Sequence, residues 1–404
     1  MQKIIMAKTG NEAMAYAMKQ VNPDVVAAYP ITPATEIVQI FSQYVADGEV
    51  KTEFVAVESE HSAMSACIGS AAAGARTMTG TSSQGLALMY EMIYIAAGLR
   101  LPIVLADVNR ALSAPINIHC DHSDTMGCRD AGWIHIFSEN AQEAYDSMIQ
   151  AVRIAEHQDV RLPVMVTTDG FIISHGMERI DTLPDAEVQS FIGKYDPMMH
   201  LLDVKKPFTI GAINLTDYYF EHRRAMVDAQ NNALKVIKEV GQEFGKKFDT
   251  NYGLIEKYQL DDAEVAIVAL GSTCGTAKVV IDQLRRKGVK AGLLKIRVFR
   301  PFPTQEIAQA LENVKTVAVL DRSDSVGGFG GPVFTEVRSA LYGSAKRPAI
   351  AGCVYGLGGR EIDMEQIEGL FMDLKAGKVK ADAVSYLGVR SEEHTSELQS
   401  PNTI

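Results

Sequence analysis

Short runs of β-branched residues alternate with longer segments of helical period along most of this 404-residue chain. A helix is expected from Asn11, and strands are expected at 24–29, 52–57, 76–81, 101–108 and 162–168, with helices between most of them. The helices include 84–98 and 141–157, and a long polar loop is expected over 109–140. Strands separated by helices pair in parallel, and a parallel sheet is buried on both faces. The chain is therefore expected to be an α/β protein whose sheets carry helices on both faces.

The alternation lapses after residue 180 and resumes near residue 262, so the chain divides into parts. We expect a first domain over 1–180, an extended connector followed by amphipathic helices over 181–261, and a second α/β domain over 262–389. The last segment, 390–404, is polar and has no apolar period. It resembles the translation of a sequencing adapter, so we expect a non-native tail and an altered C-terminus there.

Composition excludes several classes of function. The chain has 39 Lys and Arg against 50 Asp and Glu, and its net charge of -11 disfavours a nucleic-acid partner. The N-terminus lacks the apolar core of a signal peptide and no stretch is apolar enough to span a membrane, so a cytoplasmic protein is expected. The cysteines have no metal-binding or iron–sulfur spacing and are expected to be buried free thiols; they are Cys67, Cys120, Cys128, Cys274 and Cys353.

Two stretches of the first domain suggest a binding site. In AAYPITPATEI, the strand is expected to end at Tyr29, and Thr32 is expected to cap a helix that begins at Pro33. This loop lies at the carboxyl end of a parallel strand, where such sheets bind ligands, so a second role for Thr32 in binding is about as favoured as capping alone. In VESEHSAMSACIG, Glu58 and Glu60 are two apart and cannot share a helix face. On spacing alone, a glutamate at a helix start is a helix-dipole partner worth about 0.3–1 kcal/mol.

Arg110 opens the polar loop that follows the strand at 101–108. An isolated arginine there is more often in a surface ion pair than in a substrate clamp, and both alternatives stay open on the residues alone. The polar cluster in the same loop lacks the helical spacing of metal ligands and is expected to be an internal hydrogen-bond network; it comprises His119, Asp121, His122 and Asp124. The glycine-rich stretches VGGFGGP, GSTCGT and YGLGGRE match no phosphate-binding fingerprint, and the last is expected to be a tight turn.

The order E-H-S-A-M-x-A-x-x-G from Glu60 resembles the pyrimidine-binding domain of thiamine-diphosphate enzymes. Together with VVAAYPITPATEI, TSSQGLALMYEMIYIAAGLRLPIV, VNRALSAPINIHCDHSD and LPVMVTTDGFIISHG, it resembles the alpha subunits of the 2-oxoacid:ferredoxin oxidoreductases. The likeness runs from about residue 11 to 387. It implies a pyrimidine-binding domain followed by a transketolase C-terminal-like domain.

The resemblance implies an activity. The expected reaction converts pyruvate, coenzyme A and oxidised ferredoxin reversibly to acetyl-CoA, carbon dioxide and reduced ferredoxin. The alternatives are another 2-oxoacid (2-oxoglutarate, 2-oxoisovalerate or indolepyruvate) and a non-catalytic assembly homologue. A nicotinamide-dependent dehydrogenase is disfavoured because its phosphate-binding fingerprint is missing.

The resemblance also implies residue roles. In the family, a glutamate at the position of Glu60 hydrogen-bonds N1′ of the thiamine pyrimidine, and the residues at Thr32 and Arg110 meet the substrate carboxylate or carbonyl. The loop over 79–85, which contains Thr81 and Ser82, is expected to line the pyrimidine pocket. A guanidinium suits a carboxylate because it can bond both oxygens.

Missing motifs imply partners. The chain has no G-D-G…N motif to hold the diphosphate and Mg²⁺, and no cysteine spacing for an iron–sulfur cluster. A beta subunit is therefore expected to complete the cofactor site, and partner subunits to carry the clusters. The family further implies gamma and delta subunits, docking of ferredoxin through partners, and coenzyme A as co-substrate.

Overall fold

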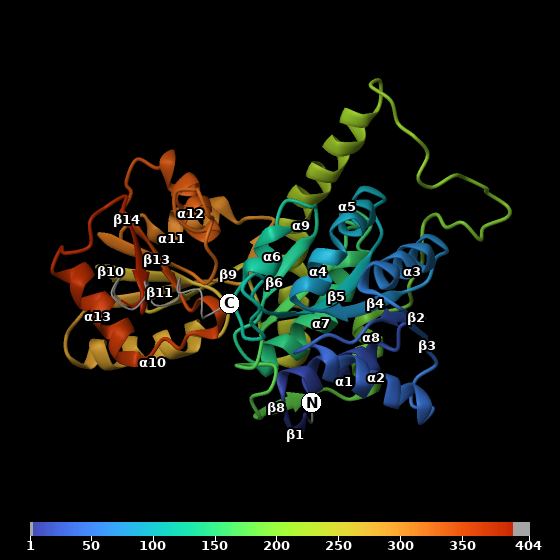
Figure 1. Cartoon of the computed structure of the whole chain (residues 1–404), viewed down its shortest axis with the longest axis horizontal. Coiled ribbons are helices and arrows are strands. Elements are labelled where there is room, and N and C mark those ends of the chain that lie inside the picture. Colours follow the sequence, from blue (N-terminus) through green and yellow to red (C-terminus); the bar gives the residue numbers. More distant parts are fainter. Residues whose placement is uncertain (1–2, 391–404) are drawn as a thin grey trace, which may run out of the picture.

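The structure is a computed structural model that describes residues 3–390, and two domains built on mainly parallel sheets lie side by side in it (Figure 1). The predicted α/β class is confirmed. Of the predicted non-native tail at 390–404, all but the first residue lies outside the described residues. Within that described range, no helix is long and apolar enough to cross a membrane.

The first domain contains a seven-stranded sheet. In spatial order its strands are β12 (Val298–Arg300), β6 (Ile134–Phe137), β7 (Val164–Asp169), β5 (Ile103–Asn109), β4 (Thr77–Thr81), β2 (Val25–Ala28) and β3 (Glu53–Ala56), and only β12 runs antiparallel to its neighbour. Strands β4, β5 and β7 are buried along their whole length, as expected for a sheet covered on both faces.

Helices lie on opposite sides of this sheet in Figure 1. One group consists of α1 (Gly10–Val21), α2 (Thr35–Ala46) and α8 (Asp185–Ile192), and the other of α3 (Glu60–Ala72), α4 (Ser83–Leu88) and α5 (Tyr90–Gly98). The long helix α7 (Ala141–Glu156) packs on β7 and α1, and short α6 (Ser123–Gly127) lies beside α4. A separate antiparallel pair joins β1 (Ile4–Lys8) to β8 (Glu178–Thr182).

The second domain contains a six-stranded sheet. In spatial order its strands are β15 (Val384–Leu387), β14 (Ala349–Tyr355), β13 (Thr316–Asp321), β10 (Val265–Ala269), β11 (Ala291–Ile296) and β9 (Ile255–Tyr258), of which only β9 is antiparallel. Its helices are α10 (Thr273–Arg286), α11 (Thr304–Leu311), α12 (Pro332–Tyr342) and α13 (Met364–Lys375). The YGLGGRE stretch after β14 forms a tight turn with a short 3₁₀ helix, η1 (Leu357–Gly359).

Between the domains, residues 193–218 contain no helix or strand and lead into one 30-residue helix, α9 (Tyr219–Phe248). The buried stripe Ala229, Ala233, Val236, Val240 and Phe244 recurs every three or four residues and packs the helix on α7 of the first domain. The amphipathic pattern therefore gives one helix, whose buried side belongs to the first domain.

Three local expectations differ from the structure. The stretch 109–140, expected to be a loop, contains α6 and β6, because the four residues of β6 are too few to show a period. The helix expected over 84–98 is divided at Met89 into α4 and α5. Strand β12 was not expected. It lies between β11 and α11 of the second domain in the chain, but it pairs with β6 of the first domain.

Asp169, at the end of β7, joins the two domains through its buried carboxylate. Oδ1 lies 2.8 Å from His122 Nε2, while Oδ2 accepts hydrogen bonds from Arg322 Nη1 at 2.8 Å and from the Ser272 backbone N–H at 3.0 Å. Burial alone would raise the pKa of Asp169, but the interactions with His122, Arg322 and Ser272 outweigh it and hold the pKa below its ordinary value. Arg322 and Ser272 belong to the second domain, so this carboxylate is an ionic connection between the domains.

The Asp169→Asn substitution should destabilise the chain, because it leaves the Arg322 guanidinium buried without its counter-charge. We expect the free energy of unfolding to fall by about 3–5 kcal/mol, measured by urea-induced unfolding followed by circular dichroism. The matched control is Asp261→Asn, which removes an exposed carboxylate paired with Lys257 and should leave the unfolding midpoint unchanged. Equal midpoints for the two variants would contradict the role assigned to Asp169.

Candidate active site

The loop after β2 contains Thr32, and its conformation differs from the one expected. Helix α2 begins at Thr35, and Ala34 occupies the N-cap position without a side-chain cap, so the prediction that Thr32 caps the helix is wrong. Residues 32–34 form a turn instead, and the carbonyl of Pro33 accepts a hydrogen bond of 2.8 Å from the buried Asn11 side chain. This contact to α1 holds the turn away from the helix axis. Thr32 remains exposed at the carboxyl edge of the sheet.

Glu60 is the first residue of α3. Its N-cap, Ser59, accepts a hydrogen bond of 3.2 Å from the Ser62 backbone N–H, so the cap does not involve the glutamate. Glu60 is 7% exposed, and within residues 3–390 no hydrogen bond or ion pair satisfies its carboxylate. Glu58, by contrast, is exposed and accepts a hydrogen bond from the Ser62 hydroxyl. Only one carboxylate of the pair is buried and unpartnered.

The turn from β4 into α4 lies against Glu60. Thr81 and Ser82 are fully buried, and within the described chain neither hydroxyl has a hydrogen-bond partner. A methyl group added at Gly85 would overlap the Thr81 hydroxyl and lie 2.7 Å from Glu60 Oε1. Glycine at this position therefore lets a carboxylate and a hydroxyl approach one another. Buried polar groups without hydrogen-bond partners cost free energy, and two of them lie in this turn beside Glu60.

Arg110 follows β5 and is 7% exposed. Its Nε donates to the carbonyl of Asn117 and its Nη1 to the carbonyl of Thr32, both at 2.9 Å. Among the described residues no carboxylate lies within 4 Å of this guanidinium, and Nη2 has no hydrogen-bond partner. Of the two alternatives for Arg110, the surface ion pair is therefore not found among the described residues. A nearly buried guanidinium without a counter-ion, with one free nitrogen, is suited to bind an anionic ligand.

Asp124, from the cluster left without a role by the sequence, connects the two sides of the site. Its Oδ2 accepts from the backbone N–H groups of Ser83 at 3.0 Å and Arg110 at 2.9 Å, and its Oδ1 accepts from the Asn109 side chain at 2.9 Å. Burial raises the pKa of Asp124 to about 6, although these hydrogen bonds lower it. Sequence spacing could not reveal this role, because the contact between 83 and 124 is made only in the folded chain.

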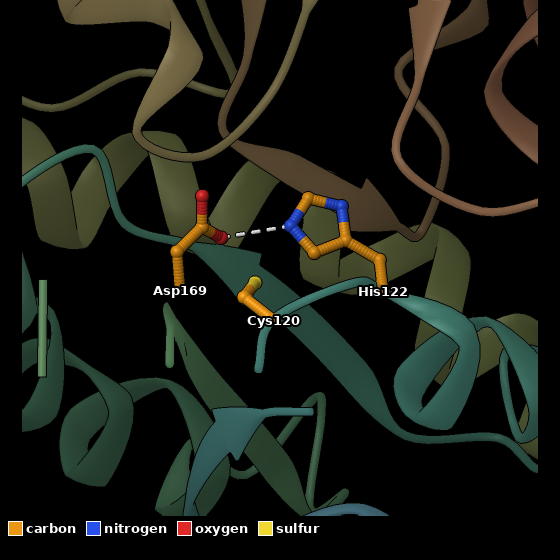
Figure 2. A group of neighbouring side chains, drawn as sticks. All are labelled: Cys120, His122 and Asp169. Atoms are coloured by element: carbon orange, nitrogen blue, oxygen red, sulfur yellow. Dashed lines mark hydrogen bonds and ion pairs between the residues drawn. The ribbon is translucent and has the colours of Figure 1, made fainter. Parts of the chain in front are cut away.

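A second cluster contains Cys120, His122 and Asp169, whose ligand-type atoms all lie within 4.8 Å of one another (Figure 2). The dashed line in Figure 2 is the contact between His122 and Asp169. Both carboxylate oxygens of Asp169 already have partners, and Arg322 supplies the positive charge that a metal ion would supply. Burial raises the pKa of the Cys120 thiol well above its ordinary value. The cluster is therefore described as an ionic and hydrogen-bond centre, in line with the expected internal network. All five cysteines are buried and free, as expected.

The predicted site residues gather at one edge of the first sheet. Thr32 follows β2, Glu60 follows β3, Thr81 ends β4 and Arg110 follows β5. The carboxyl ends of parallel strands meet at one edge, which is where open α/β sheets bind ligands. The structure brings Thr32 to Arg110, and Glu60 to Thr81 across Gly85. From the sequence, Asn11 was predicted only as the start of a helix, Gly85 only as the end of the loop over 79–85, and Asp124 only as a member of the polar cluster.

Two family models match the chain. Residues 16–242 match the thiamine-diphosphate-binding domain of pyruvate flavodoxin/ferredoxin oxidoreductases, and residues 263–367 match core domain II of pyruvate:ferredoxin oxidoreductase. The chain therefore belongs to the pyruvate:ferredoxin oxidoreductase family, in which it is a thiamine-diphosphate-binding alpha subunit.

Relatives among characterised proteins agree with this placement. The chain is 55% identical to pyruvate synthase subunit PorA of Thermotoga maritima, over 96% of this chain and 100% of that protein. It is 48% identical to pyruvate synthase subunit PorA of Methanocaldococcus jannaschii, over 95% of this chain and 97% of that protein. It is also 44% identical to ketoisovalerate oxidoreductase subunit VorA of Pyrococcus abyssi, over 91% of this chain and 92% of that protein.

Solved structures share the fold. A 2-oxoglutarate:ferredoxin oxidoreductase from Magnetococcus marinus, solved with 2-oxoglutarate, coenzyme A and succinyl-CoA bound, superposes with a TM-score of 0.73 at 20% identity, over 92% of this chain and 65% of that chain. A split-gene transketolase superposes with a TM-score of 0.53 at 11% identity, over 91% of this chain and 98% of that chain. These likenesses support the predicted fold, a pyrimidine-binding domain followed by a transketolase-like domain.

Gly85→Ala should weaken thiamine diphosphate binding, because the added methyl group takes the space between Glu60 and Thr81. Overpacking of this kind typically costs about 1–3 kcal/mol, so the dissociation constant should rise roughly 5- to 150-fold, measured by calorimetric titration of the assembled complex. Gly343→Ala is the control, since nothing lies within 4 Å of a methyl group there. Unchanged affinity in the Gly85 variant would show that the cofactor lies elsewhere.

Proposed function

We propose that this chain supplies the 2-oxoacid and pyrimidine half of the active site of a pyruvate:ferredoxin oxidoreductase. The reaction is the reversible conversion of pyruvate, coenzyme A and oxidised ferredoxin to acetyl-CoA, carbon dioxide and reduced ferredoxin. The observation that carries the proposal is the nearly buried Arg110 guanidinium beside Thr32, at the same sheet edge as the Glu60 carboxylate; within residues 3–390 neither group has a partner of opposite charge.

Glu60 is proposed to hold a proton at the aminopyrimidine N1′. When bound, thiamine diphosphate supplies a carbon nucleophile that adds to the 2-oxo group and takes up the electrons left by decarboxylation. A carboxyl group suits N1′ because it can donate a proton to a ring nitrogen and recover it. The turn with Thr81 and Ser82, whose hydroxyls have no hydrogen-bond partner within residues 3–390, is proposed to line the pyrimidine site, and Gly85 lets Glu60 approach this turn.

Arg110 is proposed to bind the substrate carboxylate. Its free Nη2 can donate to a carboxylate oxygen, and Thr32, exposed beside it, can contact the carboxylate or the 2-oxo group. A fixed carboxylate leaves the substrate few orientations, which is how positioning groups lower a barrier. Neither residue needs to exchange a proton, so their contribution is binding and orientation.

Partner subunits are proposed to complete the site. The chain lacks a G-D-G…N motif and a cluster-type cysteine spacing, so a beta subunit is inferred to hold the diphosphate and Mg²⁺, and partners to hold the iron–sulfur clusters. Gamma and delta subunits complete the proposed complex, and ferredoxin docks on a partner because this chain carries a net charge of -11. Coenzyme A is the proposed co-substrate, and the proposed location is cytoplasmic.

Another 2-oxoacid is the second candidate substrate. The ketoisovalerate subunit at 44% identity favours 2-oxoisovalerate as the alternative, while the two pyruvate synthase subunits described above are more similar. 2-Oxoglutarate and indolepyruvate are further alternatives within the class. A non-catalytic assembly homologue would have no reason to keep Arg110 and Glu60 buried without partners.

The proposed function is tested on the complex. The chain without residues 390–404 is co-expressed anaerobically with the subunits of neighbouring genes, and coenzyme-A-dependent reduction of a viologen dye is measured with four 2-oxoacids. We expect the highest kcat/KM with pyruvate. A different leading acid would reassign the substrate, and a complex that binds thiamine diphosphate but oxidises none of the acids would favour the assembly homologue.

Glu60→Gln should slow exchange of the proton at C2 of bound thiamine diphosphate by roughly 10²–10⁴-fold, because glutamine cannot transfer a proton to N1′. Exchange is measured in deuterium oxide by acid quench and NMR, on a complex whose assembly is checked by size-exclusion chromatography. Glu58→Gln, two residues away and exposed, is the matched control and should exchange like the unmodified complex. Equal exchange in both variants would refute the role of Glu60.

A further inference from the structure

The loop that begins at Arg110 has few contacts within its own domain. Between β5 and α6 it projects from the sheet edge, and Ile116 and Ile118 are 79% and 43% exposed. A backbone hydrogen bond from Ala111 to the carbonyl of His119 closes the loop on itself. Because Arg110 Nε donates to the carbonyl of Asn117, the position of the guanidinium depends on where this loop lies.

Gly358 of the second domain makes two hydrogen bonds to the loop. Asn117 Nδ2 donates to the carbonyl of Gly358 at 2.9 Å, and the backbone N–H of Gly358 donates to Asp121 Oδ2 at 3.1 Å. Asn117 therefore bonds the Arg110 guanidinium with its main chain. Its side chain bonds the second domain through Nδ2 and accepts a hydrogen bond of 2.8 Å from the His119 backbone N–H of its own loop through Oδ1; Gly358→Ala tests the first of these contacts alone. The backbone N–H of His122 adds a third attachment, a 2.8 Å hydrogen bond to the carbonyl of Arg322.

The approach of the turn to the loop requires glycine. Gly358 and Gly359 have φ angles of +59° and +79°, a region in which other L-residues are rarely found. A methyl group at Gly358 would overlap the Asn117 side-chain amide, and one at Gly359 would overlap the His119 side chain. The YGLGGRE stretch, a tight turn with no assigned role, is therefore shaped to contact the Arg110 loop.

We propose that the turn over 356–359 of the second domain is a positioning element for Arg110, acting through Asn117. The inference rests on the proposed function, in which Arg110 binds the substrate carboxylate. A loop that is largely exposed would move the guanidinium, and a group that orients a substrate must itself be held by neighbouring contacts. The second domain thereby contributes to 2-oxoacid binding without touching the substrate.

The test measures KM for pyruvate, or for the leading 2-oxoacid, in the assembled complex with Asn117→Ala. We expect KM to rise about 3- to 10-fold, as for the loss of one ordinary hydrogen bond, while thiamine diphosphate affinity and C2 proton exchange stay unchanged. Gly358→Ala should also raise KM. If the Gly358 variant does not assemble, the result for the Asn117 variant decides, because Asn117 lies in an exposed loop. Asn232→Ala is the matched control, because this side chain also donates to a backbone carbonyl, that of Asp159, but lies on α9.

A double-mutant cycle with Arg110→Lys separates positioning from general destabilisation. If Asn117 acts through Arg110, then Asn117→Ala should raise KM by less than about twofold in the Arg110→Lys background. Two outcomes would overturn the inference and leave the proposed function intact. One is that the effects of Asn117→Ala and Arg110→Lys on KM are additive. The other is that Asn117→Ala and Gly358→Ala both leave KM unchanged while Arg110→Lys raises it. An unchanged KM in Arg110→Lys itself would overturn the assigned role of Arg110, and the inference with it.

Discussion

The buried carboxylate of Asp169 is the interaction on which the arrangement of the two domains depends. It ends a central strand of the first sheet, and a carboxylate removed from water must be met by charge and hydrogen bonds. Arg322 and Ser272 of the second domain and His122 of the first meet it. Because His122 closes the loop that begins at Arg110, the same contact that joins the domains also fixes one end of the substrate-side loop. The packing of the two domains and the position of this loop therefore depend on the same contacts.

The charged groups proposed for the site differ from the ion pairs at the domain boundary. Lys295, buried at the domain boundary, meets Glu139 and Glu143, and Asp169 meets Arg322. Glu60 and Arg110 are comparably buried, yet within residues 3–390 neither has a partner of opposite charge. A folded chain tolerates such groups where a ligand completes them. Asp124 accepts hydrogen bonds from the backbone of Arg110 and from that of Ser83, whose turn lies against Glu60, and so connects the two parts of the proposed site.

Local sequence predicted the sheets well because strands such as β4, β5 and β7 are buried along their length and bounded by turns, and the helices between them have clear periods. It failed where a contact from far along the chain decides the conformation. Thr32 precedes a proline and reads as a helix cap, but the Asn11 side chain holds Pro33 in a turn. Strand β12 is three residues long and exists because β6, some 160 positions earlier, offers an edge.

The α/β class, the order of the elements and the candidate site residues could be predicted from the chain alone, because hydrophobic period, helix-start signals and the order of motifs are local properties of the chain. The folded chain was needed to see that Glu60 approaches Thr81 across Gly85, that Arg110 has no counter-ion within residues 3–390, and that a glycine turn bonds the Arg110 loop through Asn117, 241 residues away in sequence. The physical reason is that partnering is a property of neighbours in space. A buried charge that has a partner stabilises the fold, whereas one without a partner is available to a ligand. Which of the two applies depends on residues that no sequence spacing connects to that charge.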